Sequence, residues 1–216
     1  WRASANDVRR MAVSLFITQR APRWLKTPLV YVLDLLAVVP SVVFGLWGVL
    51  TLATLIQNVF IKIHNAVGGI PILRTIFGES PTDSSFMTAG IILAIMITPI
   101  ITSLAREVIE TTPANEKEAA YALGATRWEM IRGAIFPHSK VGIVGAVMLG
   151  LGRAMGETIA AALVIGGSIG QISLNVFSAG NSMPAVIANE WGEADDLHKS
   201  GLIALAVVLF LITIIV

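Results

Sequence analysis

Long apolar runs alternate with shorter polar segments along the chain, and the lengths of the runs predict membrane-spanning helices. A helix that crosses a hydrocarbon core of about 30 Å needs about 20 residues. Three runs reach that length, at residues 29–56, 86–105 and 141–165. Two shorter runs, 11–18 and 201–216, are expected to be the tail of an earlier span and most of a later one. Strands of a membrane barrel alternate polar and apolar residues in segments of about ten, which these runs do not, so the pattern predicts an all-α, polytopic membrane protein.

The composition agrees with a membrane protein and excludes several kinds of site. The chain is 55% hydrophobic and 13% charged, whereas a soluble domain carries about a quarter charged residues. A net charge of +1 leaves no one-signed face for nucleic acid, and without cysteine there is no disulfide, thiolate nucleophile or cysteine metal site. The three histidines lie in separate loops, so neither a metal nor another cofactor is expected. Both ends are expected to be cut, because the chain starts at Trp1 and is still apolar at Val216.

Basic residues in the loops predict the orientation in the membrane. Loop 18–28 carries three and loop 106–140 carries five, whereas loops 57–85 and 166–200 carry two and one. If every span crosses once, the first two loops share a side, and an excess of Lys and Arg marks the cytoplasmic side. Loop 106–140 is therefore expected in the cytoplasm. Loop 166–200 faces outward, and its acidic cluster at 190–196 is either a solvated face or an aid to docking an external binding protein.

The long loop between the second and third spans is expected to fold as a helix–turn–helix. Thr112 is expected to cap a first helix that begins at Pro113, where a missing N–H is harmless. Gly124 is placed to end this helix in the left-handed conformation. Residues 126–129 have the spacing of a capping box that opens a second helix, which Pro137 is expected to end.

This loop also carries the residues of a short family motif, in the order and spacing of that motif: Glu118, Ala119, Ala120, Gly124 and Pro137. It resembles the EAA loop of binding-protein-dependent ABC importers, although that pattern expects Ile and Leu where this chain has Ala134 and Phe136. The resemblance implies that the loop is a coupling element, inserted into a cleft on an ATP-binding subunit. The alternative is an amphipathic helix that rests on lipid headgroups.

Two charges lie inside the third predicted span, at Arg153 and Glu157. A charge at the centre of a membrane helix costs about 2.5–3.5 kcal/mol on insertion scales, and residues at i and i+4 share a helix face. The pair is therefore expected to face a polar cavity or another subunit, with a structural ion pair that locks two helices as the alternative. Gly152, Gly156 and Ala160 form a small-residue ladder that predicts close helix packing.

The segment 152–160 resembles the motif of phosphate-specific permeases, in its PstC-type rather than its PstA-type form, and residues 34–48 resemble the same subunit. By this resemblance Arg153 and Glu157 belong to the translocation path. An arginine suits an oxyanion because its planar fork can donate two hydrogen bonds to a phosphate.

The resemblance implies one permease domain over residues 1–216, a truncated core similar to type I ABC importers. Its implied function is to carry inorganic phosphate across the bacterial cytoplasmic membrane by alternating access. The implied partners are an ATP-binding subunit dimer, a PstA-type second permease subunit, and a periplasmic or lipid-anchored phosphate-binding protein. No GxxxxGK[ST] motif is present, so ATP hydrolysis is expected on a partner and the chain itself is not expected to be an enzyme. The alternatives are a permease for sulfate or molybdate and a secondary transporter.

Three further residues interrupt the apolar runs. Asp34 is expected to be satisfied at the membrane interface or against a neighbouring helix, with a direct role in transport as the alternative. Pro40 and Pro99 are expected to kink their helices, and the carbonyls that they free are candidates to line the pathway.

Overall fold

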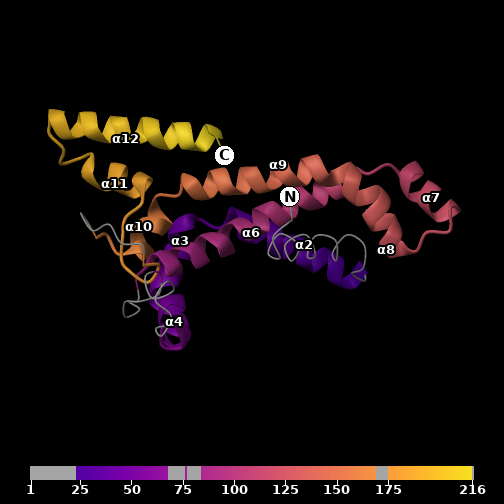
Figure 1. Cartoon of the computed structure of the whole chain (residues 1–216), viewed down its shortest axis with the longest axis horizontal. Helices are drawn as coiled ribbons and strands as arrows, with labels where there is room; N and C mark the ends of the chain where they lie inside the picture. The colour runs from indigo at the N-terminus through magenta and orange to yellow at the C-terminus, as the bar shows by residue number, and fades with distance from the viewer. Residues whose placement is uncertain (1–22, 68–75, 77–83, 169–174, 216) are drawn as a thin grey trace. The chain divides into compact units, whose positions relative to one another are not determined.

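The computed structural model describes residues 23–67, 76, 84–168 and 175–215. Most of these residues are helical, and the β-structure among them is an isolated parallel β-bridge between Gly166 and Gly180. The all-α prediction is confirmed. The helices, with two π-helical segments η1 and η2, are α2 (Arg23–Val38), α3 (Ser41–Trp47), η1 (Gly48–Leu52), α4 (Ala53–Val67), α6 (Phe86–Glu110), α7 (Ala114–Ala122), α8 (Arg127–Met130), η2 (Ile131–Ile135), α9 (Phe136–Met155), α10 (Ile159–Ile165), α11 (Met183–Glu190) and α12 (Asp196–Ile215) (Figure 1).

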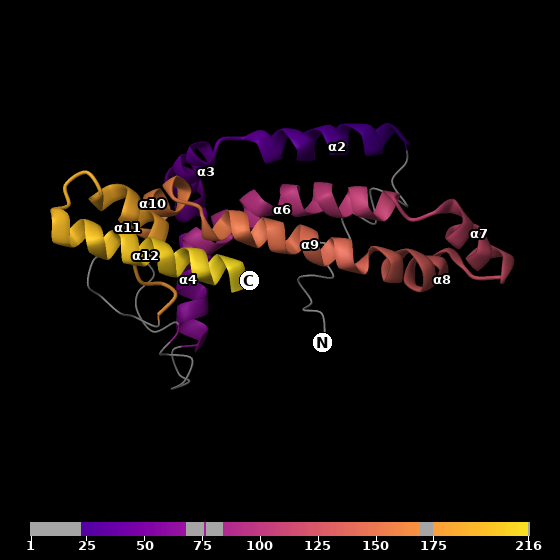
Figure 2. The ribbon, with the colours of Figure 1, turned by 90° about the horizontal axis from the view of Figure 1, so that it is seen from above.

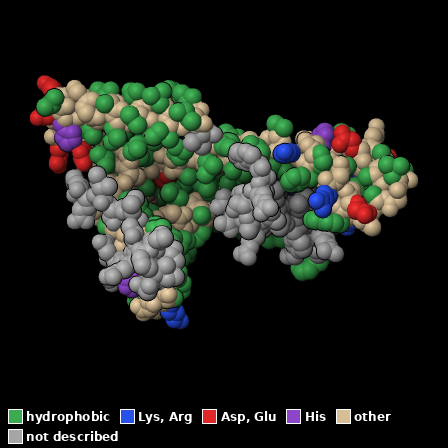
Figure 3. Space-filling model, viewed as in Figure 1, with side chains coloured by type: hydrophobic (Ala, Val, Ile, Leu, Met, Phe, Trp, Pro, Cys, Tyr) green, Lys and Arg blue, Asp and Glu red, His purple; other side chains and the backbone are tan. Residues whose placement is uncertain are grey.

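Four continuous helical stretches are long and apolar enough to cross a membrane: Ser41–Ala66, Phe86–Glu110, Arg127–Met155 and Asp196–Ile215. The expected span at 86–105 is confirmed and runs on to Glu110, and the later span begins at Asp196. The expected tail at 11–18 lies outside the described residues. Large apolar side chains stay exposed along α12, as Figure 3 shows, which suits a helix that faces lipid.

The expected span at 29–56 is wrong, because the chain breaks before Pro40. The backbone at Pro40 is extended (φ −57°, ψ 137°), and a residue that precedes a proline is disfavoured in the helical region. Pro40 therefore separates two helices instead of kinking one, and α2 is a helix of its own with 16 residues. Pro99, by contrast, lies inside α6, which continues for another eleven residues to Glu110.

The expected span at 141–165 is also wrong. Helix α9 ends at Met155, residues 156–158 are not helical, and α10 starts at Ile159. The membrane-spanning stretch instead begins earlier, at Arg127, because α8, η2 and α9 follow one another without interruption.

The chain divides into two compact units, residues 1–38 with 97–151 and residues 39–96 with 152–216. In the first unit, buried side chains from α6, α8, η2 and α9 form one apolar cluster: Ala105, Ile109, Met130, Ile135 and Ile143. Helices α6 and α9 approach closely here, since a Cβ added at Gly142 would lie 2.5 Å from Cγ1 of Val108. Asp34 of α2 accepts a hydrogen bond from the hydroxyl of Ser103 at 3.3 Å, so it is satisfied against a neighbouring helix, as expected.

In the second unit, α3 packs against α10 and α11 against α12 (Figure 2). The non-helical segment before α11 is part of the core, because Phe177 is fully buried and its ring centroid lies 5.0 Å from that of Phe60. This segment also completes the start of α6. The N–H groups of Phe86 and Met87 donate to the carbonyls of Ser178 and Val176 at 3.1 and 2.8 Å, which satisfies donors that a helix start leaves without intrahelical partners.

Candidate functional site

Arg153 lies in the last turn of α9, where the negative end of the helix dipole favours a cation. Its side chain is exposed. Within the described part of the chain, no hydrogen bond or ion pair involves its guanidinium group. The five N–H donors of this arginine are therefore available to a ligand.

Glu157 lies in the break between α9 and α10, and its side chain is only 9% exposed. Its Oε1 accepts a hydrogen bond from the backbone N–H of Ala160 at 3.3 Å. The first N–H groups of a helix have no intrahelical partner, so the carboxylate satisfies one donor in the first turn of α10.

The predicted sharing of one helix face by Arg153 and Glu157 is wrong, because the helix ends at Met155, between the two residues. No ion pair joins them in the described residues. The predicted small-residue ladder is interrupted for the same reason. A Cβ added at Gly152 meets nothing within 4 Å, whereas Ala160 of α10 lies directly against Gly45 of α3.

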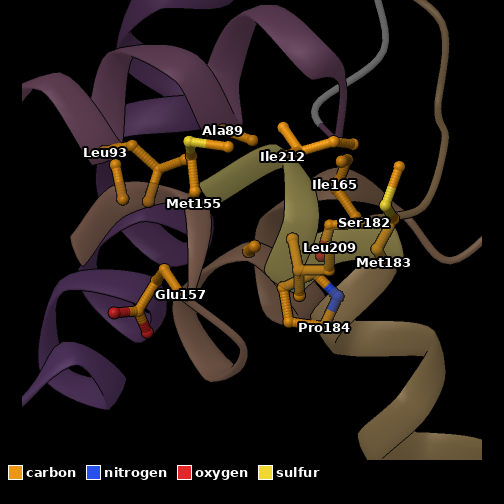
Figure 4. A pocket seen from close by; sticks show the side chains of 12 residues that line it. Ala89, Leu93, Met155, Glu157, Ile165, Ser182, Met183, Pro184, Leu209 and Ile212 are labelled. Carbon is orange, nitrogen blue, oxygen red and sulfur yellow. The ribbon is translucent and has the colours of Figure 1, made fainter. Parts of the chain in front are cut away.

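A pocket of about 250 Å³ lies beside the break, within the second unit. Its walls are mainly apolar side chains from α6, α9, α10, α11 and α12, among them Leu93, Met155, Ile165, Met183 and Leu209 (Figure 4). The carboxylate of Glu157 turns away from these labelled side chains. Apolar side chains offer no hydrogen-bond donors to an oxyanion, so this pocket is not itself suited to binding phosphate.

The loop after α6 forms the expected helix–turn–helix, here called the knob (residues 111–130). Helix α7 ends as predicted, with Gly124 at φ +82°, a conformation that glycine adopts without strain. The N–H of Gly124 donates to Tyr121 O at 2.9 Å, and the N–H of Ala125 donates to Ala120 O at 3.1 Å. These two hydrogen bonds define a Schellman motif. The capping box between Thr126 and Glu129 is also confirmed, with reciprocal hydrogen bonds at 2.7 and 3.4 Å.

Two expectations about the knob are wrong. Pro113, not Thr112, precedes α7, and the hydroxyl of Thr112 lies instead 3.3 Å from that of Ser139 in a buried pair. Pro137 does not end the second helix. Segment η2 shifts the hydrogen-bond register just before it, with Phe136 N–H donating to Ile131 O, and such a bulge accommodates a residue that lacks an N–H.

The surface of the knob combines the motif residues with large apolar side chains. Glu118 and Ala119 are exposed, and Ala120 packs against the apolar cluster of the first unit. The sequence reasoning missed Tyr121, Leu123 and Trp128, which are 48%, 90% and 65% exposed. The signal was present in the sequence, since large apolar residues in a solvated loop beside a helix-ending glycine are unusual unless a partner covers them.

The comparisons with known proteins agree on one family. The family model described as "Binding-protein-dependent transport system inner membrane component" matches residues 11–216. The chain is 44% identical over 206 residues to a phosphate transport system permease protein PstC from Haemophilus influenzae, covering 94% of this chain and 65% of that protein. Proteins of the same name from Xylella fastidiosa and Mesorhizobium japonicum are 40% and 41% identical, over 94% and 95% of this chain and 63% of each relative.

The chain thus spans slightly less than two thirds of the length of these relatives, at 65%, 63% and 63%. Four helices long and apolar enough to cross a membrane are what an inner membrane component requires, and the model of that family matches residues 11–216. The chain belongs to the family of binding-protein-dependent transport system inner membrane components.

Proposed function

We propose that this chain is part of the membrane-spanning permease subunit of an ATP-driven importer of inorganic phosphate. The observation that carries the proposal is the guanidinium of Arg153, which has no protein partner in the described residues and lies at the end of a membrane-spanning helix. The relatives named as phosphate transport permeases point to the same substrate.

Arg153 lies in the last turn of the spanning stretch Arg127–Met155, where the cost of insertion is below the value of about 2.5–3.5 kcal/mol for a helix centre. Its charge is therefore tolerated at this helix end and is available to an anion. A phosphate that passes this position would accept two parallel hydrogen bonds from the planar fork, a geometry that a lysine cannot offer. Arg153 is therefore the residue that we assign to anion recognition on the translocation path.

Glu157 is assigned two roles on the same path. Its carboxylate holds the start of α10 through Ala160. Its negative charge, four residues after the arginine, would also keep the guanidinium from retaining the anion too strongly.

The knob is assigned to coupling. We propose that a dimer of ATP-binding subunits contacts Glu118–Gly124 from the cytoplasm, the side that the excess of basic residues indicates. The apolar cluster ties α7 to α6 and α9 through Ala120, so that a push on the knob moves both helices. The continuous stretch Arg127–Met155 begins in the knob and carries Arg153 in its last turn. This arrangement supports alternating access driven from the cytoplasm.

Two further partners complete the proposal. A PstA-type second permease subunit would cover apolar surface of the spanning helices and provide the other side of the path. A periplasmic or lipid-anchored phosphate-binding protein would dock on the outward loop between α11 and α12. Across that loop, Nε2 of His198 in the first turn of α12 lies 2.8 Å from Oε2 of Glu190 at the end of α11.

The test is ATP-dependent uptake of labelled phosphate by vesicles that contain the full-length subunit and its partners. We expect Arg153→Gln to abolish uptake and Arg153→Lys to retain only a small part of it, with normal amounts of assembled complex. Wild-type uptake in Arg153→Gln would overturn the assignment of Arg153. Stronger competition by sulfate or molybdate than by unlabelled phosphate would instead identify another oxyanion, and uptake without ATP-binding subunits would identify a secondary transporter.

A further inference from the structure

Helix α3 (Ser41–Trp47) has no role in the proposed path, yet it lies against α10. The close contact is at Gly45, which is buried. A Cβ added there would lie 2.9 Å from the backbone Cα of Ala160 and 2.9 Å from Cδ1 of Leu163. Carbon atoms pack best at about 3.5–4.0 Å, so a side chain of any size at this position would push against α10 itself.

The backbone that Gly45 touches is the one that holds Glu157. Ala160 donates its N–H to Oε1 of Glu157 at 3.3 Å, and Ala160 is 1% exposed. The backbone N–H groups of Gly156 and Glu157 donate to Gly152 O and Ala154 O of α9 at 3.2 Å, so the backbone of the break is tied to α9. The hydrogen bond that orients the Glu157 carboxylate goes instead to α10, whose position is limited by its contact with α3 at Gly45.

We propose that Gly45 is a positioning residue for Glu157: it lets α3 approach the backbone of Ala160 and so fixes the hydrogen bond that orients the carboxylate. This inference rests on the proposed function in one respect, namely that Glu157 acts on the translocation path. Gly45 itself touches no substrate.

The neighbouring glycines provide a comparison. At Gly48 an added Cβ would meet the end of the Ile92 side chain and lie 3.5 Å from Cγ2 of Val164, so it would meet side chains and not the backbone of α10. At Gly90, near the start of α6, it would meet nothing within 4 Å. Gly90→Ala is thus a matched control for Gly45→Ala, with the same added methyl group on an apolar helix and no neighbour to displace.

The first experiment measures the position of the break without relying on transport. Residues 1–216 contain no cysteine, so Thr158→Cys introduces a single thiol into this part of the subunit, next to Glu157. We expect a charged thiol reagent to label the assembled complex several times faster after Gly45→Ala, and at an unchanged rate after Gly90→Ala. Equal labelling rates in all three proteins would overturn the inference.

The second experiment asks whether Gly45 acts through Glu157. We expect Gly45→Ala to lower the maximal rate of phosphate uptake roughly tenfold, within the range for coupled residues. In the Glu157→Gln background the same change should have an effect below about twofold, because the positioned charge is already gone. Equal effects in both backgrounds would mean that Gly45 only packs, and would overturn the inference.

The experiments distinguish a wrong assignment of Glu157 to the path from a wrong assignment of Gly45 as its positioning residue. If Glu157→Gln leaves uptake unchanged, the assignment of Glu157 to the path is wrong, while the labelling experiment still decides whether Gly45 positions it. If Gly45→Ala reduces the amount of assembled complex, Ala160→Ser replaces it, because this change adds one atom on the other side of the same contact. It should reproduce both the faster labelling and the dependence on Glu157.

Discussion

The Oε1 of Glu157 accepts a hydrogen bond from the backbone N–H of Ala160 at 3.3 Å, at the point where one helix has ended and the next begins. Arg153, four residues earlier, belongs to the end of the preceding helix. The two opposite charges therefore do not neutralise each other along one helix face. Each instead complements the helix end that it occupies, a cation at a C-terminus and an anion at an N-terminus.

This relationship predicts that the charge and the hydrogen bond of Glu157 can be separated. Glu157→Gln keeps an oxygen that can accept from Ala160 but removes the charge, whereas Glu157→Ala removes both. We expect both variants to transport phosphate more slowly than the wild type, and only the alanine variant to lose stability, by about 0.5–2 kcal/mol as for other helix caps. Thermal unfolding of the purified complex, read beside uptake, measures the difference. Equal melting temperatures for the two variants would show that the hydrogen bond contributes nothing.

Leu123 is predicted to contribute most of the apolar contact between the knob and an ATP-binding subunit. It is 90% exposed in the isolated chain, and full burial of a leucine side chain is worth about 1.5–3 kcal/mol. Leu123→Ser should therefore weaken co-purification of the ATP-binding subunit at least roughly tenfold, since each 1.4 kcal/mol is tenfold in affinity. Leu197→Ser is the control, because Leu197 is 83% exposed at the start of α12. An equal loss in both variants would contradict a specific contact at Leu123.

Gly124 is predicted to be intolerant of a side chain although it has space for one. An added Cβ meets nothing within 4 Å, but the backbone has φ +82°, which disfavours other L-residues by about 1–2 kcal/mol. Gly124→Ala should speed amide hydrogen exchange throughout α7, and Gly124→Asn should restore part of the protection because asparagine tolerates this conformation better. Gly145→Ala, at an exposed helical position without a close neighbour, should leave exchange in α7 unchanged. Full protection in Gly124→Ala would mean that the turn can adopt another conformation.

Asp34 is predicted to have a structural role only. It accepts a hydrogen bond from Ser103 at 3.3 Å, and an asparagine at this position still offers an oxygen to that hydroxyl. We expect Asp34→Asn to transport phosphate at the wild-type rate. Asp34→Leu should lose about 1 kcal/mol of stability, the usual net value of such a hydrogen bond. A loss of uptake in Asp34→Asn, at a normal amount of complex, would place this carboxylate on the path after all.

The sequence by itself determined the features that depend on chain-local chemistry. The span predicted at 86–105 follows from a run without charged residues, because the hydrocarbon core disfavours charge, and the helix itself continues to Glu110. The left-handed turn at Gly124 and the capping box at 126–129 need only a few consecutive residues to form. The family motif could likewise be identified from spacing alone.

Only the tertiary structure decided where the apolar runs break and which long-range contacts form. The run at 141–165 has only two charges and is apolar on both sides of the break, so its average hydropathy did not indicate that α9 ends at Met155. Hydrophobicity is a property of each residue, whereas the break is stabilised by a carboxylate that reaches Ala160 and by α3 lying against the same backbone at Gly45. At Pro137 the sequence predicted the end of a helix, but the helix continues there. The hydrogen-bond register shifts in η2 just before the proline, and this shift accommodates it. At the break the contact with Gly45 comes from a distant part of the chain, and a linear pattern of hydrophobicity does not contain such a contact.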